Sequence, residues 1–259
     1  MENPLMPLYA VAANVFDLPR VLDALRQLTG LQPFLRFELV LAHGFVPVAL
    51  VMCGDETLEF LAHAQGSRPP GAARITSVLL EIPGREPAEA ELEPGLRLAI
   101  RPGPQTRLVE VEIVSGAREA EMAFLQSACG AIQGTGSESG EGLLALGDVR
   151  LRFPSPAGAA AVHGAQDPGQ RLPGWHRISL ACQDLESAVA ALMEAGAGVE
   201  VPPYQVLPGL REAILRSPSG LIIQPAVQQL WKMLPVFGFK ALAAKLSGDP
   251  VRLGAAPTN

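Results

Sequence analysis

Aromatic residues and cysteines are scarce in this chain of 259 residues, and no basic stripe with interleaved aromatics appears. The cysteines Cys53, Cys129 and Cys182 are odd in number, far apart and form no CxxC pair. The sequence therefore predicts no disulfide framework and favours the reducing cytoplasm. A net charge of −6 also argues against nucleic acid as a partner, because binding to phosphates needs clustered Lys and Arg.

Long apolar runs are missing as well. The longest are interrupted well before they could span a bilayer, so no transmembrane helix is expected, and the N-terminus lacks the basic start of a signal peptide. Hydrophobic residues nevertheless make up 48% of the chain, which allows a sizeable core. The 26 glycines and 24 prolines indicate many turns, as in a strand-rich protein. The length suits one large domain or two smaller ones.

Two stretches share one layout of a strand, a helix and three further strands. In the first, residues 8–15 are strand-like, Asp17 can cap a helix, and Gly30 ends a run of apolar residues at helical spacing. In the last, Asp184 takes the same capping position, and the turn at 217–220 separates the final two strands. The pattern indicates a repeated βαβββ module.

A middle stretch repeats the layout more weakly, and the segment before it lacks the helix. Residues 107–114 alternate as a strand does, 117–129 have the pattern of a helix, and 143–153 read as a tight hairpin. Segment 73–104 shows strands alone, so it is either a degenerate module or an inserted hairpin.

These modules predict an α+β fold, because one βαβββ unit cannot bury its own sheet face and must pair with another. With four modules in the order of the chain, we expect two domains and a tail. The predicted bounds are 1–104 for an N-terminal domain, 105–227 for a C-terminal domain and 228–259 for an amphipathic, helical tail.

The phrases ISLACQDLESAVAAL and LRSPSGLIIQP resemble modules of the vicinal oxygen chelate superfamily, which includes glyoxalases, bleomycin-resistance proteins and extradiol dioxygenases. AVAANVFDLPRVLDAL and GDETLEFL fit the same outline. The resemblance implies glyoxalase-like domains and a divalent metal. Its ligands would be a His or Glu on the first strand of a module and a Glu on the last.

This chain departs from that ligand pattern. The matching positions are Arg177 and Gln224 in the last module, Leu108 and Arg152 in the middle module, and Ala10 and Glu59 in the first. Only Glu59 is of a ligand type, because a guanidinium has no lone pair to offer. We therefore expect no standard metal site and no cofactor. A divalent metal stays the alternative, since a shift of one residue along the strand would bring in His176.

Glu110 and Glu112 are the predicted catalytic residues, on the cavity side of their strand. If the third and fourth modules pair, Arg152, Arg177 and Gln224 approach them and, with Glu59, can bind a polar ligand. A buried Glu with a raised pKa could serve as a general base for isomerase, cyclase or lyase chemistry. The alternative is that these charges pair with one another or face solvent.

Three functions stay open. The first is a metal-independent enzyme acting on a small organic molecule, the second a non-catalytic small-molecule binding or resistance protein, and the third a metal-dependent glyoxalase or dioxygenase. A homodimer is compatible with each. The basic, aromatic tail 228–252 is a weak candidate for membrane contact and more typical of docking onto the protein itself.

Overall fold

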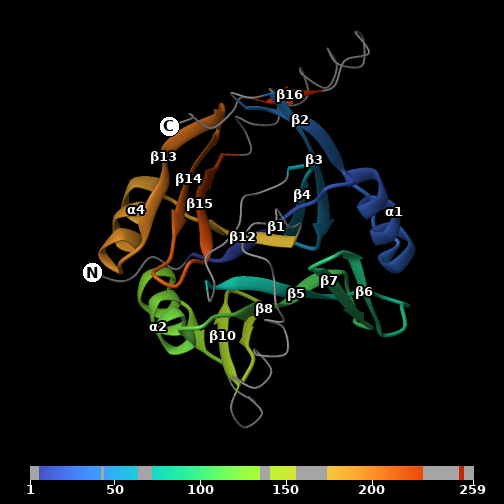
Figure 1. Ribbon diagram of the computed structural model, residues 1–259, viewed down its shortest axis with the longest axis horizontal. Coiled ribbons are helices and arrows are strands. Elements are labelled where there is room, and N and C mark those ends of the chain that lie inside the picture. Colours follow the sequence, from blue (N-terminus) through green and yellow to red (C-terminus); the bar gives the residue numbers. More distant parts are fainter. Residues whose placement is uncertain are drawn as a thin grey trace.

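The computed structural model describes residues 6–41, 44–63, 72–134, 141–155, 174–229 and 251–253. They form two curled β-sheets, one above the other in Figure 1, with helices packed on their flanks. None of the helices in these ranges is long and apolar enough to cross a membrane. The prediction of an α+β fold built from repeated modules is confirmed.

The first module consists of β1 (Leu8–Asn14), α1 (Leu18–Thr29), β2 (Leu35–Leu41), β3 (Gly44–Cys53) and β4 (Glu56–Leu61). Helix α1 begins where the sequence predicts. The side chain of Asp17 accepts a hydrogen bond of 3.1 Å from the backbone N–H of Arg20, and Pro19 lies in the first turn. Gly30 ends the helix with a left-handed φ of 80°, which a residue with a Cβ adopts only at a cost.

The last module repeats this order. It consists of β12 (Gly174–Ala181), α4 (Leu185–Glu194), β13 (Gly198–Leu207), β14 (Leu210–Arg216) and β15 (Ile222–Gln228). Asp184 caps α4 by accepting a hydrogen bond of 3.2 Å from the backbone N–H of Ser187. The buried stripe of α4, which includes Leu185 and Leu192, packs toward the sheet.

The two modules share a sheet of nine strands in the order β13-β14-β15-β12-β1-β4-β3-β2-β16. Strands β1 and β12 lie antiparallel at its centre. The short β16 (Arg252–Leu253) adds in parallel to β2, so the end of the predicted tail returns to this sheet. Residues 230–250 of the tail lie outside the described residues.

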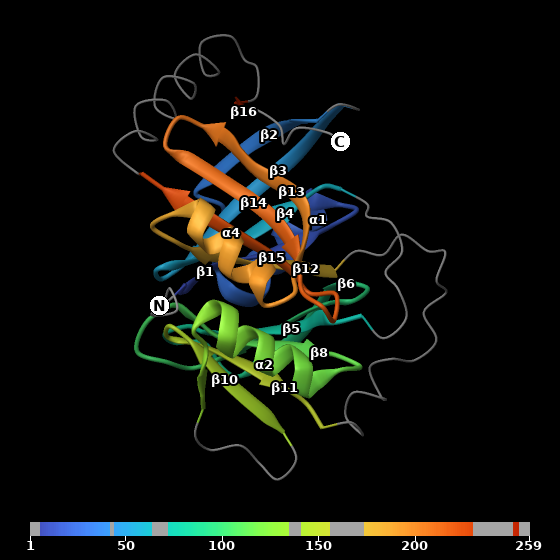
Figure 2. The same cartoon turned by 90° about the vertical axis from the view of Figure 1, so that its left-hand side faces the viewer.

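The second sheet has seven strands in the order β6-β7-β5-β8-β11-β10-β9. Its strands are β5 (Arg74–Glu81), β6 (Ala88–Glu93), β7 (Leu96–Arg101), β8 (Arg107–Val114), β9 (Ile132–Gln133), β10 (Gly142–Leu146) and β11 (Val149–Phe153). One helix, α2 (Arg118–Cys129), belongs to it and lies below α4 in Figure 2. The segment from β5 to β7 contains strands and no helix, as expected of a degenerate module.

The modules pair differently from the prediction. The first module shares a sheet with the last, and the second with the third, whereas the sequence pattern led us to expect pairing of the third with the fourth. Strand β5 pairs with β8 across the predicted boundary at residue 104, so the division into 1–104 and 105–227 does not follow the sheets. Each module carries a similar strand pattern, and that local pattern does not specify a partner.

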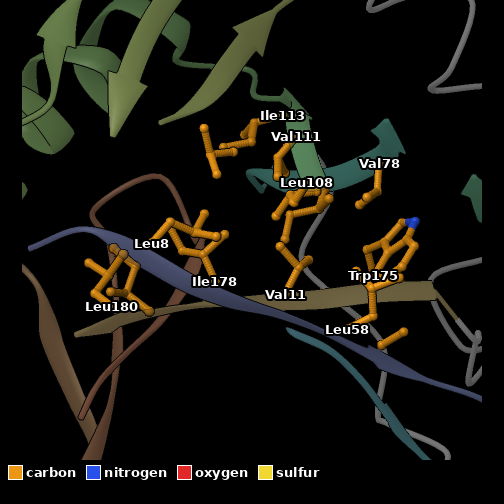
Figure 3. Packing of buried hydrophobic residues seen from close by; sticks show 14 of the residues in the cluster. Leu8, Val11, Leu58, Val78, Leu108, Val111, Ile113, Trp175, Ile178 and Leu180 are labelled. Atoms are coloured by element: carbon orange, nitrogen blue, oxygen red, sulfur yellow. The ribbon is translucent and has the colours of Figure 1, made fainter. Parts of the chain in front are cut away.

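One apolar core lies between the two sheets. Figure 3 shows Val11 and Ile178 of the first sheet facing Leu108 and Val111 of the second. Trp175 is 1% exposed, and its ring nitrogen donates a hydrogen bond of 2.8 Å to a backbone carbonyl of β7. This shared core covers one face of the first sheet and leaves the opposite face, here named the inner face, for the side chains described next.

Candidate functional site

The inner face of the first sheet carries an apolar cluster of its own. It consists of Ala12, Phe37, Val46, Val48 and Leu61 on strands β1 to β4. Val206 and Leu210, from β13 and β14 at the other end of the sheet, pack on the same cluster. This contact agrees with the curl of the sheet in Figure 1, in which the outer strands bend toward the same side.

Beside the apolar cluster lies a network of polar side chains centred on Arg177. Its guanidinium donates a hydrogen bond of 2.8 Å to Glu59 Oε2 and another, through Nε, to Gln224 Oε1. Ser179 Oγ donates to the same Gln224 oxygen at 3.1 Å. Arg177 is 8% exposed and Gln224 3%, so their polar atoms are largely shielded from water and depend on one another.

Strand pairing explains why these side chains meet. Side chains alternate along β12, so Ile178 and Leu180 point into the shared core while Arg177 and Ser179 point to the inner face. Arg177 lies opposite Ala12 on β1, and Ala12 lies opposite Glu59 on β4. Because Ala12 carries a single methyl group, the long side chain of Arg177 can extend over it to the carboxylate.

Two tyrosines and a second carboxyl complete the network. Tyr204 on β13 lies opposite Glu212 on β14, and its hydroxyl donates to the Glu212 carboxyl. The register of β1 against β12 shifts at Tyr9, as it does at a β-bulge. The hydroxyl of Tyr9 forms a hydrogen bond with the side chain of Gln228. We refer to Tyr9, Glu59, Arg177, Ser179, Tyr204, Glu212 and Gln224 as the polar cluster.

The Glu212 carboxyl has a perturbed proton affinity. Burial raises its pKa above the usual range for Glu, and the negative charge of Glu59 adds to the effect. The hydrogen bond from Tyr204 and the positive charge of Arg177 act in the opposite direction without cancelling it. Burial likewise raises the pKa values of Tyr9 and Tyr204, so both are neutral phenols near neutral pH.

Tyr9, Tyr204 and Glu212 were not predicted from the sequence. Tyr9 was missed because the bulge changes the face to which it points, which alternation along the strand does not foresee. Glu212 and Tyr204 lie on strands that the family pattern does not associate with a site. A signal was nevertheless present, because alternation along LREAILR places Glu212 on the same face as Leu210 and Ile214, between two apolar residues.

A divalent metal does not fit the residues at the expected ligand positions. The oxygens of Glu59 and Gln224 both accept hydrogen bonds from Arg177, so a guanidinium takes the place where the family pattern puts a cation. A second positive charge there would be repelled, and Arg cannot act as a ligand. Within the described ranges, no group of three or more His, Cys, Asp or Glu is arranged to hold a metal ion. Arg177, and not His176, makes these contacts, so the predicted strand phase is confirmed.

Glu110 and Glu112 lie elsewhere, on the second sheet. Arg152 Nε donates 2.8 Å to Glu110, which also pairs with Arg150 at 3.2 Å. Arg152 pairs with Glu112 as well, and Thr76 Oγ1 donates 2.5 Å to that carboxylate. These charges therefore pair with one another, which was the alternative weighed from the sequence.

The expectation that Arg152 joins Arg177 and Gln224 is wrong, because their modules belong to different sheets. Leu108 also differs from expectation. A register shift in the pairing of β8 with β5 skips Val109 and turns Leu108 into the shared core, away from the side of Glu110. The structure thus divides the predicted site residues into two groups, with Glu59, Arg177 and Gln224 on the first sheet and Glu110, Glu112 and Arg152 on the second.

Comparisons with known proteins bear on the fold. No protein-family model and no curated protein matches the sequence. Among solved structures, glyoxalase I from Zea mays superposes with a TM-score of 0.64 at 14% identity, covering 90% of this chain and 96% of that one. A putative dioxygenase from Bacillus subtilis subsp. subtilis str. 168 gives 0.61 at 13% identity, covering 87% of this chain and 86% of that one. These matches show that the chain has a glyoxalase-like fold, as the sequence motifs led us to expect.

Proposed function

We propose that the protein binds a small organic molecule at the inner face of the first sheet and acts on it without a divalent metal. The observation that carries this proposal is the position of Arg177, whose guanidinium donates to both Glu59 and Gln224. These are oxygens that the family pattern would offer to a metal. With a guanidinium already bound to them, the site recognises its ligand through hydrogen bonds and fixed charges.

The composition of the inner face supports a small-molecule site. Typical sites combine a mainly apolar lining with a few polar groups that orient the ligand. Here the apolar cluster around Phe37 and Val48 and the polar cluster around Arg177 share one face of one sheet. The apolar part offers contact to a hydrophobic group, and the polar part offers donors and acceptors.

Acid–base chemistry is the reaction type that these residues can support. Glu212, whose pKa burial raises, can act on a bound substrate as a general acid while it is protonated, or as a general base when the substrate displaces its proton. Tyr204 and Arg177 would then stabilise the carboxylate that is left. This is compatible with isomerase, cyclase or lyase activity.

Two alternatives rest on separate observations. A binding protein without catalysis is favoured by the extent of the apolar cluster, to which both ends of the sheet contribute. Catalysis by Glu110 or Glu112 on the second sheet stays a prediction, and replacing each with Gln tests it. Unchanged turnover would remove both as bases.

The test begins with elemental analysis of protein purified without chelator. We expect Mn, Fe, Ni and Zn well below one equivalent, and stoichiometric metal would refute the metal-free proposal. A thermal-shift screen of small carbonyl compounds, hydroxy acids and amines then identifies ligands, and NMR follows whether they are converted. The Glu212→Gln variant should abolish conversion, while Glu186→Gln, in the exposed ion pair with Arg211, serves as the matched control.

A further inference from the structure

The polar cluster contains two carboxyls and one guanidinium. Glu59 is bound directly to Arg177, and their charges balance. Glu212 is the second carboxyl, and its hydrogen-bond partners within the cluster are neutral, the hydroxyl of Tyr204 and the side-chain amide of Gln224. If both carboxyls were ionised, the cluster would carry one net negative charge in a partly buried environment.

A proton on Glu212 would supply the missing positive charge. Burial raises the pKa of Glu212, which means that the carboxyl retains its proton where an exposed Glu would lose it. Neither Tyr9 nor Tyr204 adds a negative charge, because burial raises both phenol pKa values as well. A ligand that brings its own positive charge would make this proton unnecessary.

An anionic ligand is disfavoured by the same contacts. Arg177 is the one cation of the cluster, and it already donates to Glu59 and Gln224. A ligand carboxylate would be a third carboxyl beside Glu59 and Glu212, with this single guanidinium to balance them. A cation instead meets the carboxyl of Glu212, whose ionised form attracts it.

We propose that the ligand of this site is an organic cation, an ammonium group attached to an apolar body, in which the ammonium replaces the proton on Glu212. The apolar body would lie on the cluster around Phe37 and Val48 on the same face. This inference rests on the proposed function, since it assumes that the inner face is the binding site. The displaced proton leaves to solvent, so each ligand bound to the protonated form releases one proton.

The test uses three probes with the same carbon chain: hexylammonium, hexan-1-ol and hexanoate. Isothermal titration calorimetry on the full chain measures each affinity, in two buffers of different ionisation enthalpy so that proton release is measured too. Glu212→Gln removes the ionisable group. Glu186→Gln, in the exposed ion pair with Arg211, removes a similar charge from the surface and is the matched control.

We expect hexylammonium to bind at least about tenfold tighter than hexan-1-ol and hexanoate, which corresponds to about 1.4 kcal/mol. At pH values below the pKa of Glu212, its affinity should rise about tenfold for each unit by which the pH is increased, because the carboxylate is the form that binds it. Glu212→Gln should abolish both the preference and the proton release, and Glu186→Gln should retain them. Tyr204→Phe keeps the ring and removes the donor to Glu212, and it should weaken the binding of hexylammonium but not of the other two probes. This variant replaces Glu212→Gln in the test if Glu212→Gln does not fold.

The outcomes separate the two proposals. Equal or tighter binding of hexan-1-ol or hexanoate, with or without Glu212, would overturn the cation inference and leave the site proposal standing. A preference for hexylammonium that persists in Glu212→Gln would also overturn it. Binding of no probe at any accessible concentration would overturn both.

Discussion

Replacing Arg177 with Met tests whether the guanidinium is the cation on which the inner face depends. Met approximates the length and apolar volume of the side chain but removes its charge and its donors. The ion pair with Glu59 is 2.8 Å long, and the two side chains are 9% and 16% exposed. Breaking a buried pair from one side typically costs 3–5 kcal/mol, because the remaining charge has no partner. We expect about 3 kcal/mol here, the low end of that range, since Glu59 keeps some contact with water.

The assay is urea denaturation of four proteins at neutral pH: wild type, Arg177→Met, Glu59→Gln and the double variant. The double variant should be more stable than Arg177→Met, because it no longer buries an unpaired carboxylate.

Two results would refute this reasoning. One is a loss of less than about 1 kcal/mol for Arg177→Met, the value typical of an exposed ion pair. The other is a double variant no more stable than Arg177→Met, which would mean that the uncompensated charge of Glu59 is not the source of the loss.

Three further predictions follow from buried groups. Glu121 is fully buried and accepts a 2.7 Å hydrogen bond from Ser217, and burial raises its pKa. Because the folded pKa lies above the unfolded one, the protein loses stability as the pH rises above the unfolded pKa of this group. The Glu121→Gln variant should therefore have a higher urea midpoint than wild type at pH 7 and lose that advantage near pH 4. Equal midpoints at both pH values would contradict this. Changing Arg177 to His together with Gln224 to Glu places two metal-ligand types beside the carboxylate of Glu59. This double variant, unlike wild type, should bind Co²⁺ and show visible d–d absorption. A variant that stays colourless with Co²⁺ would show that the three positions do not converge on a metal. Trp175→Ala should cost about 3–5 kcal/mol in urea denaturation because it opens a cavity between the sheets, and a loss below about 1 kcal/mol would argue against a shared core.

Local structure was largely predictable from the sequence. Asp17 and Asp184 cap α1 and α4 as their positions predicted, because capping depends on residues three apart in the chain. Alternation along β12 correctly placed Arg177 on the side opposite Ile178. The replacement of metal-ligand types by Arg177 and Gln224 therefore follows from the order of residues along two strands.

Partner choice and register were decided by the tertiary structure. Arg177 and Glu59 are 118 residues apart in the chain, and they meet only because the first and last modules share a sheet. Four modules of similar pattern leave that choice to the packing of their outer faces against a common core, which local periodicity does not encode. The bulge at Tyr9 shows the same limit. One extra residue in a strand reverses the face of a side chain, and it arises from pairing between distant strands and not from the residues beside it.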